Sequence, residues 1–221
     1  MGLTLYCAPG SCSVAAQIAL EETAVDFDLV CLDLAAAEQR KPAFLAVNPR
    51  GRVPALVADG TAITENIAIL TYVAHRFPEA ELLPFADLKL LARAFELMSW
   101  FASGVHVSFA QIFRSERFAD DEATKRHLKS DGRQRVLLAY TELEALARAG
   151  EWMLGRSYSV VDPYALAFWR WGSRLDIDMH DYPAWTAHAR RVLERPAAQR
   201  ALARESAASA RPQPKLATSV A

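Results

Sequence analysis

The sequence has no excess of charge of either sign, because 25 lysines and arginines are balanced by 26 aspartates and glutamates. Proteins that bind nucleic acid or anionic membranes usually carry a positive excess on the binding surface. The formal net charge of -1 therefore gives no electrostatic support for either partner. The sequence also lacks an apolar run near the roughly 20 residues of a membrane-spanning helix, so we expect no transmembrane segment.

Cysteine is scarce. The three cysteines, Cys7, Cys12 and Cys31, are an odd number and contain no CxxC pair, so no disulfide framework is indicated. The N-terminus lacks a basic segment followed by a long apolar run, and we therefore expect no signal peptide. A cytoplasmic protein with reduced thiols is predicted.

One stretch, from Asn48 to Asn66, contains several turn and strand signals in a fixed order. Asn48-Pro-Arg-Gly51 predicts a turn, because proline presets φ at the second turn position and glycine accepts a positive φ. Asp59-Gly60, between two short apolar runs, predicts a β-hairpin.

The same stretch predicts a ligand site at a helix start. Thr64 is expected to cap a helix whose first turn holds Glu65, where free backbone N–H groups attract anions. Pro54 precedes the first hairpin strand, and a cis Val53-Pro54 bond would turn the Val53 backbone outward to a ligand. A trans bond is the commoner alternative for an X-Pro pair.

Asn-Pro-x-Gly-x-Val-Pro-x-Leu, a hairpin and then Thr-Glu-x-x-Ala-Ile together resemble the glutathione-binding half of the thioredoxin-like domain of glutathione transferases. The resemblance implies a cis Val53-Pro54 bond and glutathione as co-substrate, with no metal. It implies that the Val53 backbone pairs with the cysteinyl part of glutathione and that Glu65 and Asn66 hold its γ-glutamyl group. A homodimer is also implied.

The expected fold is α/β followed by all-α. The order β-α-β-α-β-β-α, with strands at 3–7 and 27–32 and a helix around Ala35–Ala46, is the thioredoxin-like layout. Beyond residue 87 only helical patterns occur, at Leu88–Arg114, Asp120–Ala149, Ser159–Leu175, Pro183–Glu194 and Ala197–Arg204. We expect a glutathione-binding domain at 1–80, a helical domain at 88–205 and a flexible tail at 206–221.

Cys12 is the strongest catalytic candidate. It follows a Pro-Gly-Ser turn at a predicted helix start, where the helix dipole lowers a thiol pKa, and we expect it to be partly exposed. An ordinary small residue in a first turn is the alternative. Pro-Gly-Ser-Cys-Ser is similar to the bacterial beta class, in which this cysteine faces the glutathione sulfur. Ser11 is a weaker nucleophile candidate and is more readily explained as a cap.

His106 lies on the apolar stripe of the predicted helix 88–114. A hydrogen-bonded core histidine is one interpretation; the resemblance implies a second, in which His106 lies near Cys12 and glutathione. By the same resemblance Phe109, Phe113 and Trp171 line the pocket for the apolar co-substrate, whereas core packing is the alternative for these rings.

Several polar positions of the beta-class pattern are absent. Ala37, Ser99, Gly104 and Val107 replace residues that are commonly a lysine, an asparagine, a glutamate and a lysine. Arg52, at a position often near glutathione, could supply the missing positive charge.

The sequence thus predicts a glutathione transferase that conjugates small apolar electrophiles, exchanges thiols through Cys12, or does both. Glutathione-dependent dehalogenation, isomerisation and ether cleavage would use the same site. A non-catalytic scaffold for ligands or proteins is the alternative. Asp162, in the capping-box pattern Ser159-Val-Val-Asp162, is expected to serve folding.

Overall fold

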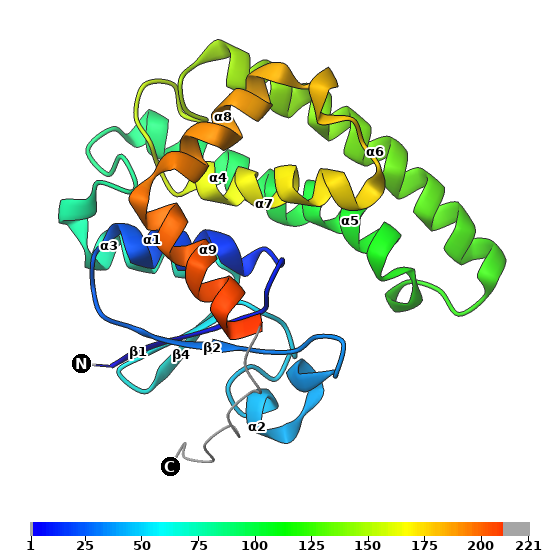
Figure 1. Ribbon diagram of the computed structural model, residues 1–221, viewed down its shortest axis with the longest axis horizontal. Coiled ribbons are helices and arrows are strands. Elements are labelled where there is room, and N and C mark those ends of the chain that lie inside the picture. The colour runs from blue at the N-terminus through cyan, green and yellow to red at the C-terminus, as the bar shows by residue number, and fades with distance from the viewer. Residues whose placement is uncertain (1, 210–221) are drawn as a thin grey trace. The chain divides into compact units, whose positions relative to one another are not determined.

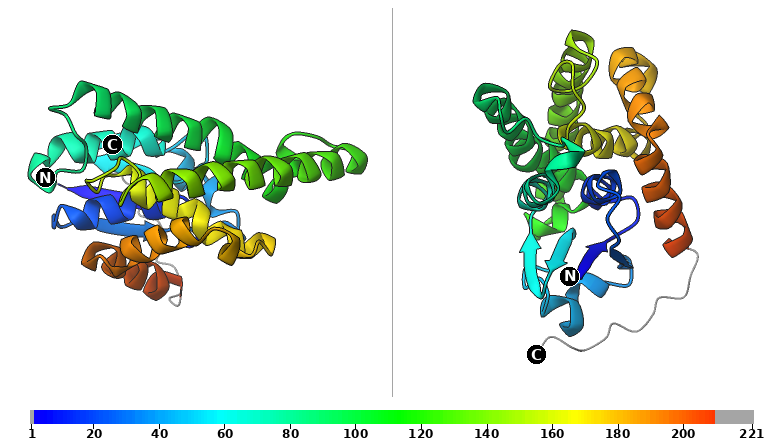
Figure 2. Two further views of the ribbon diagram at one scale, coloured as in Figure 1. Left: turned by 90° about the horizontal axis from the view of Figure 1, so that it is seen from above. Right: turned by 90° about the vertical axis from the view of Figure 1, so that its left-hand side faces the viewer.

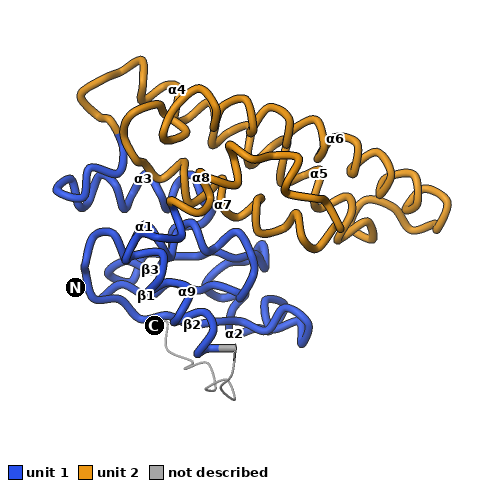
Figure 3. The backbone as a smooth tube through the Cα atoms, turned by 45° about the horizontal axis from the view of Figure 1, so that its top comes forward, with its two compact units in different colours: residues 1–83, 192–221 blue, residues 84–191 orange. Residues whose placement is uncertain are grey.

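The computed structural model describes residues 2–209, which fall into two compact units (Figure 3). Unit 1 comprises residues 1–83 and 192–221, and unit 2 comprises residues 84–191. The last helix, α9 (Pro196–Ser209), thus belongs to unit 1. The expected tail begins inside this helix, while residues 210–221 lie outside the described range. The domain limits expected from the sequence stay a prediction.

Unit 1 contains a four-stranded sheet in the order β2-β1-β3-β4. Its strands are β1 (Leu3–Cys7), β2 (Asp28–Cys31), β3 (Ala55–Ala58) and β4 (Thr61–Thr64). The central strand β1 pairs in parallel with β2 and antiparallel with β3. This mixed sheet confirms the thioredoxin-like layout.

The β3–β4 hairpin turns at Asp59 and Gly60, as predicted. Both residues have positive φ, 47° and 82°, which is the requirement of the type I′ turn that matches strand twist.

Helices α1 (Ser13–Glu22) and α3 (Asn66–Arg76) pack against each other, and α9 lies beside α1 (Figures 1 and 2). Phe44, in the short helix α2 (Pro42–Leu45), packs into a separate core cluster with Leu32, Val47 and Ala55. This cluster includes the partly buried Val53, so it supports the segment that leads into β3.

The prediction of one helix over Ala35–Ala46 is wrong. The Asp33 carboxylate accepts the N–H groups of Ala35 and Ala36, and Ala37 adopts a left-handed φ of 53°. Lys41 is extended because Pro42 disfavours a helical residue before it. Only a three-residue 3₁₀ turn and α2 form there.

Unit 2 is built from helices and connecting loops and contains no β-strand among its described residues. The predicted helix 88–114 forms as α4 (Leu88–Trp100) and α5 (His106–Phe113), joined by a π-helical segment, Phe101–Val105. The other long helices are α6 (Glu122–Ala149), α7 (Val161–Gly172) and α8 (Pro183–Glu194), which ends in unit 1. Among the described helices, none combines the length and apolar character needed to cross a bilayer.

A fully buried carboxylate organises the start of α7. Asp162 accepts the N–H groups of Met153 (2.8 Å) and Ser159 (2.7 Å) and contacts Nε2 of His188 at 2.8 Å. Both Asp162 and His188 are 0% exposed. The capping arrangement predicted for Ser159 and Asp162 is thus confirmed and extends to α8.

We predict that Asp162→Ala lowers the free energy of unfolding by about 3 kcal/mol or more, because two backbone N–H groups, the Ser159 hydroxyl and the His188 ring lose their buried acceptor. Urea unfolding of the purified variant measures this. Asp178→Ala is the matched control: it removes an exposed carboxylate that caps His180 and should cost about 1 kcal/mol or less. Equal losses in the two variants would contradict the role assigned to Asp162.

Candidate functional site

The loop between β1 and α1 carries Cys12 and is held by two hydroxyls. Ser11 Oγ donates to the Ala8 carbonyl (2.7 Å) and accepts the Ser13 N–H (3.2 Å), while Ser13 Oγ accepts the Ala8 N–H (3.1 Å). The two hydroxyls also contact each other. Ser11 therefore shapes the loop before α1, but the N-cap of this helix is Cys12 and has no side-chain cap hydrogen bond, so the interpretation of Ser11 as the cap is wrong.

Cys12 is buried, with only 5% of its surface exposed. Burial raises the pKa of its thiol to about 12, and the negative charge of Glu65 adds to the rise. The N–H of Cys12 itself and the Asn66 side chain lower the pKa by less than burial raises it. The predictions of partial exposure and of a lowered pKa are therefore wrong for the ligand-free chain: the helix-start effect is present, but desolvation is larger.

The start of α3 meets the start of α1. Asn66 Nδ2 donates to the Cys12 carbonyl at 3.1 Å. Asn66 is 6% exposed, and its Oδ1 atom is buried with no hydrogen-bond partner among the described residues. A buried acceptor without a donor is rare, which makes this oxygen a candidate contact for a ligand N–H.

Glu65 directly precedes α3 rather than lying in its first turn as predicted, and Thr64 does not cap the helix. Glu65 has φ 73°, a left-handed value that is uncommon for a residue with a side chain. Such values concentrate at ligand-binding positions.

The Val53-Pro54 peptide bond is cis, as the resemblance implied. The Cys12 thiol lies 3.9 Å from the Val53 carbonyl oxygen. Asn48 Nδ2 donates to the Arg52 carbonyl at 2.7 Å and so fixes the chain before the cis bond. The Arg52 side chain itself is exposed. Unit 1 therefore brings together Cys12, Val53, Pro54, Glu65 and Asn66.

Unit 2 gathers the predicted aromatic residues. The His106 ring lies 5.1 Å from that of Trp171, which is 5.0 Å from Phe109. Phe113 stacks on Phe109 at 5.8 Å. Phe109 (1% exposed) and Trp171 (7%) belong to the core, whereas Phe113 is 36% exposed.

His106 directly follows the π-helical segment, which the sequence did not reveal. Single π turns inside helices are frequent at functional sites. The segment contains Gly104, where a Cβ atom would lie 3.1 Å from Trp100, so a larger residue would displace that ring. The other departures, Ala37, Ser99 and Val107, are exposed.

Cys7 and Cys31 are buried, with their sulfur atoms 2.8 Å apart across β1 and β2. All three cysteines are free. The hydrogen bond to Cys31, together with burial, raises the pKa of the Cys7 thiol.

Two site contacts were missed by sequence reasoning: the Asn48 bond to Arg52 and the bond from Gly10 N–H to the Glu205 carboxylate. The Asn48 bond could have been predicted from the sequence, since Asn48 begins the predicted turn. Nothing in the local sequence around Glu205 indicates a partner near the N-terminus. No group of three or more potential metal-binding side chains occurs in residues 2–209.

Two family models match the chain: the N-terminal domain of glutathione S-transferase over residues 1–75 and its C-terminal domain over residues 106–196. Glutathione S-transferase GST-4.5 of Xanthomonas campestris pv. campestris is 32% identical, over 92% of this chain and 98% of its own. The disulfide-bond oxidoreductase YfcG of Escherichia coli is 28% identical, over 90% and 94%.

Solved structures agree with these matches. A glutathione transferase homologue from Sulfitobacter with bound glutathione has a TM-score of 0.87 and 34% identity, covering 92% of this chain and 98% of its own. The beta-class glutathione S-transferase of Sphingomonas chungbukensis has a TM-score of 0.81 and 34% identity, covering 91% and 98%.

We predict that alkylation of Cys12 in the ligand-free protein keeps accelerating with pH, about tenfold per unit up to about pH 10, because only the thiolate reacts. Iodoacetamide labelling followed by peptide mass spectrometry measures the rate at Cys12 alone. The same pKa shift makes stability fall as pH rises from the ordinary thiol value of 9.0 toward 12, since the unfolded chain loses this proton first.

Glu65→Gln should move the labelling profile to lower pH, because it removes a charge that raises the Cys12 pKa. Glu79→Gln, an exposed glutamate of the same unit, is the control and should leave the profile in place. A labelling rate that levels off below pH 7 would show that the resting thiol is ionised.

Proposed function

This chain belongs to the glutathione S-transferase family and acts as a glutathione transferase; we propose that it activates glutathione through Cys12 and transfers it to small apolar electrophiles. The observation that carries this proposal is the convergence of the cis Val53-Pro54 backbone, the Cys12 thiol and the unpartnered Asn66 oxygen within one unit. Similarity to glutathione-bound structures supports glutathione as the ligand.

Glutathione lies extended along the segment before β3. Its cysteinyl unit pairs with the Val53 backbone, and its γ-glutamyl ammonium binds the Glu65 carboxylate. Asn66 Oδ1 accepts a glutathione N–H, which satisfies the buried oxygen. Arg52, exposed beside the same segment, binds a carboxylate of glutathione.

Cys12 acts first as a hydrogen-bond donor. A thiol with a raised pKa keeps its proton at neutral pH, so it can donate to the glutathione sulfur and favour the thiolate there. The glutathione thiol gives up its proton to solvent, and the resulting thiolate attacks the electrophile and displaces its leaving group. The gain comes from a lowered glutathione pKa and from orientation of the two reactants.

Thiol–disulfide exchange is a second activity of the same site. A Cys12 thiolate attacks the glutathione sulfur of a mixed disulfide between glutathione and a substrate thiol, forms a Cys12–glutathione disulfide and releases the substrate thiolate. A glutathione thiolate then attacks the Cys12–glutathione disulfide, which yields glutathione disulfide and returns the Cys12 thiolate. Similarity to the disulfide-bond oxidoreductase relative supports this activity.

The second substrate binds against the aromatic cluster of unit 2. His106 and the half-exposed Phe113 provide its polar and apolar contacts, backed by the buried Phe109 and Trp171. His106 serves the substrate as a proton donor or acceptor. A cytoplasmic location is consistent with the three free thiols.

The protein is proposed to form a homodimer. A groove of about 280 Å³ lies between the α4–α5 region and α6 and is lined in part by Trp100, Val107 and Leu138. Leu138 is 71% exposed and Val107 38%, an unusual exposure for apolar residues on neighbouring helices.

We predict one glutathione site per chain by calorimetric titration, with affinity reduced roughly tenfold or more in Glu65→Ala because the ammonium loses its charged partner. Glu79→Ala, an exposed glutamate of the same unit, serves as the control. Cys12→Ala should retain binding but lose conjugation and exchange. Absence of heat from both reduced and oxidised glutathione would favour the non-catalytic scaffold instead.

Leu138→Lys should convert the dimer to a monomer in sedimentation velocity at micromolar concentration, because a charge would be buried in an apolar contact. Leu88→Lys changes a 78% exposed leucine outside the groove lining and should leave the dimer intact. A wild-type protein that sediments as a monomer would overturn the homodimer.

A further inference from the structure

Helix α9, the last described helix of the chain, packs against α1, the helix that begins beside Cys12 (Figure 1). The buried side of α9 carries the small residues Ala197, Ala198 and Ala201. Small side chains let the two helix backbones approach closely, so that polar groups can meet across the contact.

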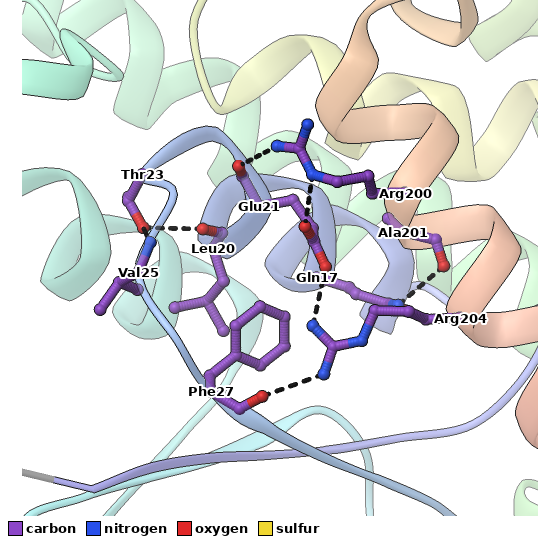
Figure 4. Close-up of polar contacts among 9 residues, drawn as sticks. All are labelled: Gln17, Leu20, Glu21, Thr23, Val25, Phe27, Arg200, Ala201 and Arg204. Carbon is purple, nitrogen blue, oxygen red and sulfur yellow. Dashed lines mark hydrogen bonds and ion pairs between the residues drawn. The ribbon is translucent and has the colours of Figure 1, made fainter.

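A buried glutamate fastens the two helices. Glu21 of α1 is 7% exposed and accepts Arg200 Nε at 2.9 Å and Arg204 Nη1 at 2.8 Å (Figure 4). The same guanidinium groups also donate to the backbone carbonyls of Glu21 (2.7 Å) and Phe27 (2.9 Å). Charge-assisted bonds of this kind are among the stronger ones in proteins.

Two further contacts set the register of α9. Gln17 Nε2, in the middle of α1, donates to the Ala201 carbonyl at 2.8 Å. Arg195, which directly precedes α9, donates through two nitrogens to the Glu22 carboxylate. The helix is thus fixed along its length and not only at one end.

One turn beyond Ala201, Glu205 reaches the loop before Cys12. Its carboxylate accepts the N–H of Gly10, and its residue is only 6% exposed. Gly10 has φ 69°, a left-handed conformation that favours glycine, and lies two residues before Cys12. The contact joins residues 195 positions apart in sequence.

We infer that Glu205 is a positioning residue for Cys12, which it holds in place through the Gly10 peptide while α9 is fastened to α1. The hydroxyl contacts of Ser11 and Ser13 are local and fix the shape of the loop. The Glu205 contact instead bonds the loop to α9, so it fixes the position of the loop relative to that helix. The inference deepens the proposed function, because its value for catalysis depends on Cys12 acting there.

The test measures Cys12 alkylation in the ligand-free protein together with steady-state kinetics. Glu205→Ala removes the acceptor, so the loop should loosen, expose the thiol to water and accelerate alkylation at pH 8 about tenfold. kcat for conjugation should fall about tenfold, since reactant orientation suffers. Glu205→Asp keeps the charge on a shorter side chain and should change the alkylation rate and kcat as Glu205→Ala does. If Glu205→Ala does not fold, Glu205→Asp provides the test.

Two variants separate positioning from stability. Glu205→Gln keeps an acceptor oxygen at the same reach and should restore the labelling rate and kcat. Glu22→Gln weakens the ion pair to Arg195 at the far end of α9 and should lower Tm without changing either quantity.

Unchanged alkylation in both Glu205→Ala and Glu205→Asp would overturn the inference, whatever their activity. Alkylation needs no glutathione, so this result stays distinct from a failure of the proposed function. That failure would show as absent binding and turnover in the wild-type protein.

Discussion

Strand β1 is hydrogen-bonded along both edges, and the position of the candidate site in unit 1 depends on this constraint. A strand paired in parallel on one side and antiparallel on the other cannot shift its register without losing both sets of bonds. The carboxyl end of β1 at Cys7 is therefore fixed. Because the loop that follows is short, it restricts the positions that Cys12 can occupy. The cis bond at Val53-Pro54 leads into β3, the antiparallel neighbour, so both walls of the site derive from one strand pair.

The burial of Cys12 decides whether the site presents a thiolate or a protonated thiol. An exposed, ionised cysteine would be open to alkylation and oxidation throughout the life of the protein. A covered thiol with a raised pKa stays protonated at neutral pH and is slow to react. The candidate site therefore combines a covered thiol, the cis backbone at Val53-Pro54 and a buried Asn66 Oδ1 that has no hydrogen-bond partner among the described residues.

Local rules predicted much of the fold. The Asp59-Gly60 hairpin, the capping pair Ser159–Asp162 and the helix Pro183–Glu194 all depend on nearby residues and appear as expected. The helix expected around Ala35–Ala46 failed because the Asp33 side chain competes for its first N–H groups. The prediction of a lowered Cys12 pKa failed for another reason. Desolvation depends on which residues cover the side chain in the folded protein, and the sequence near Cys12 does not show them. The contact of Glu205 with Gly10 was hidden for the same reason.

The return of α9 to unit 1 makes that unit discontinuous in sequence. During synthesis from the N-terminus, the sheet and α1 leave the ribosome long before α9 exists, and all of unit 2 is made in between. Before α9 is synthesised, Glu21 and Gln17 lie on a surface of α1 that α9 does not yet cover, and they lack their hydrogen-bond partners on α9. The nascent chain therefore carries an unfinished thioredoxin-like unit through most of its translation, and a premature stop near residue 195 would leave that unit without its final helix.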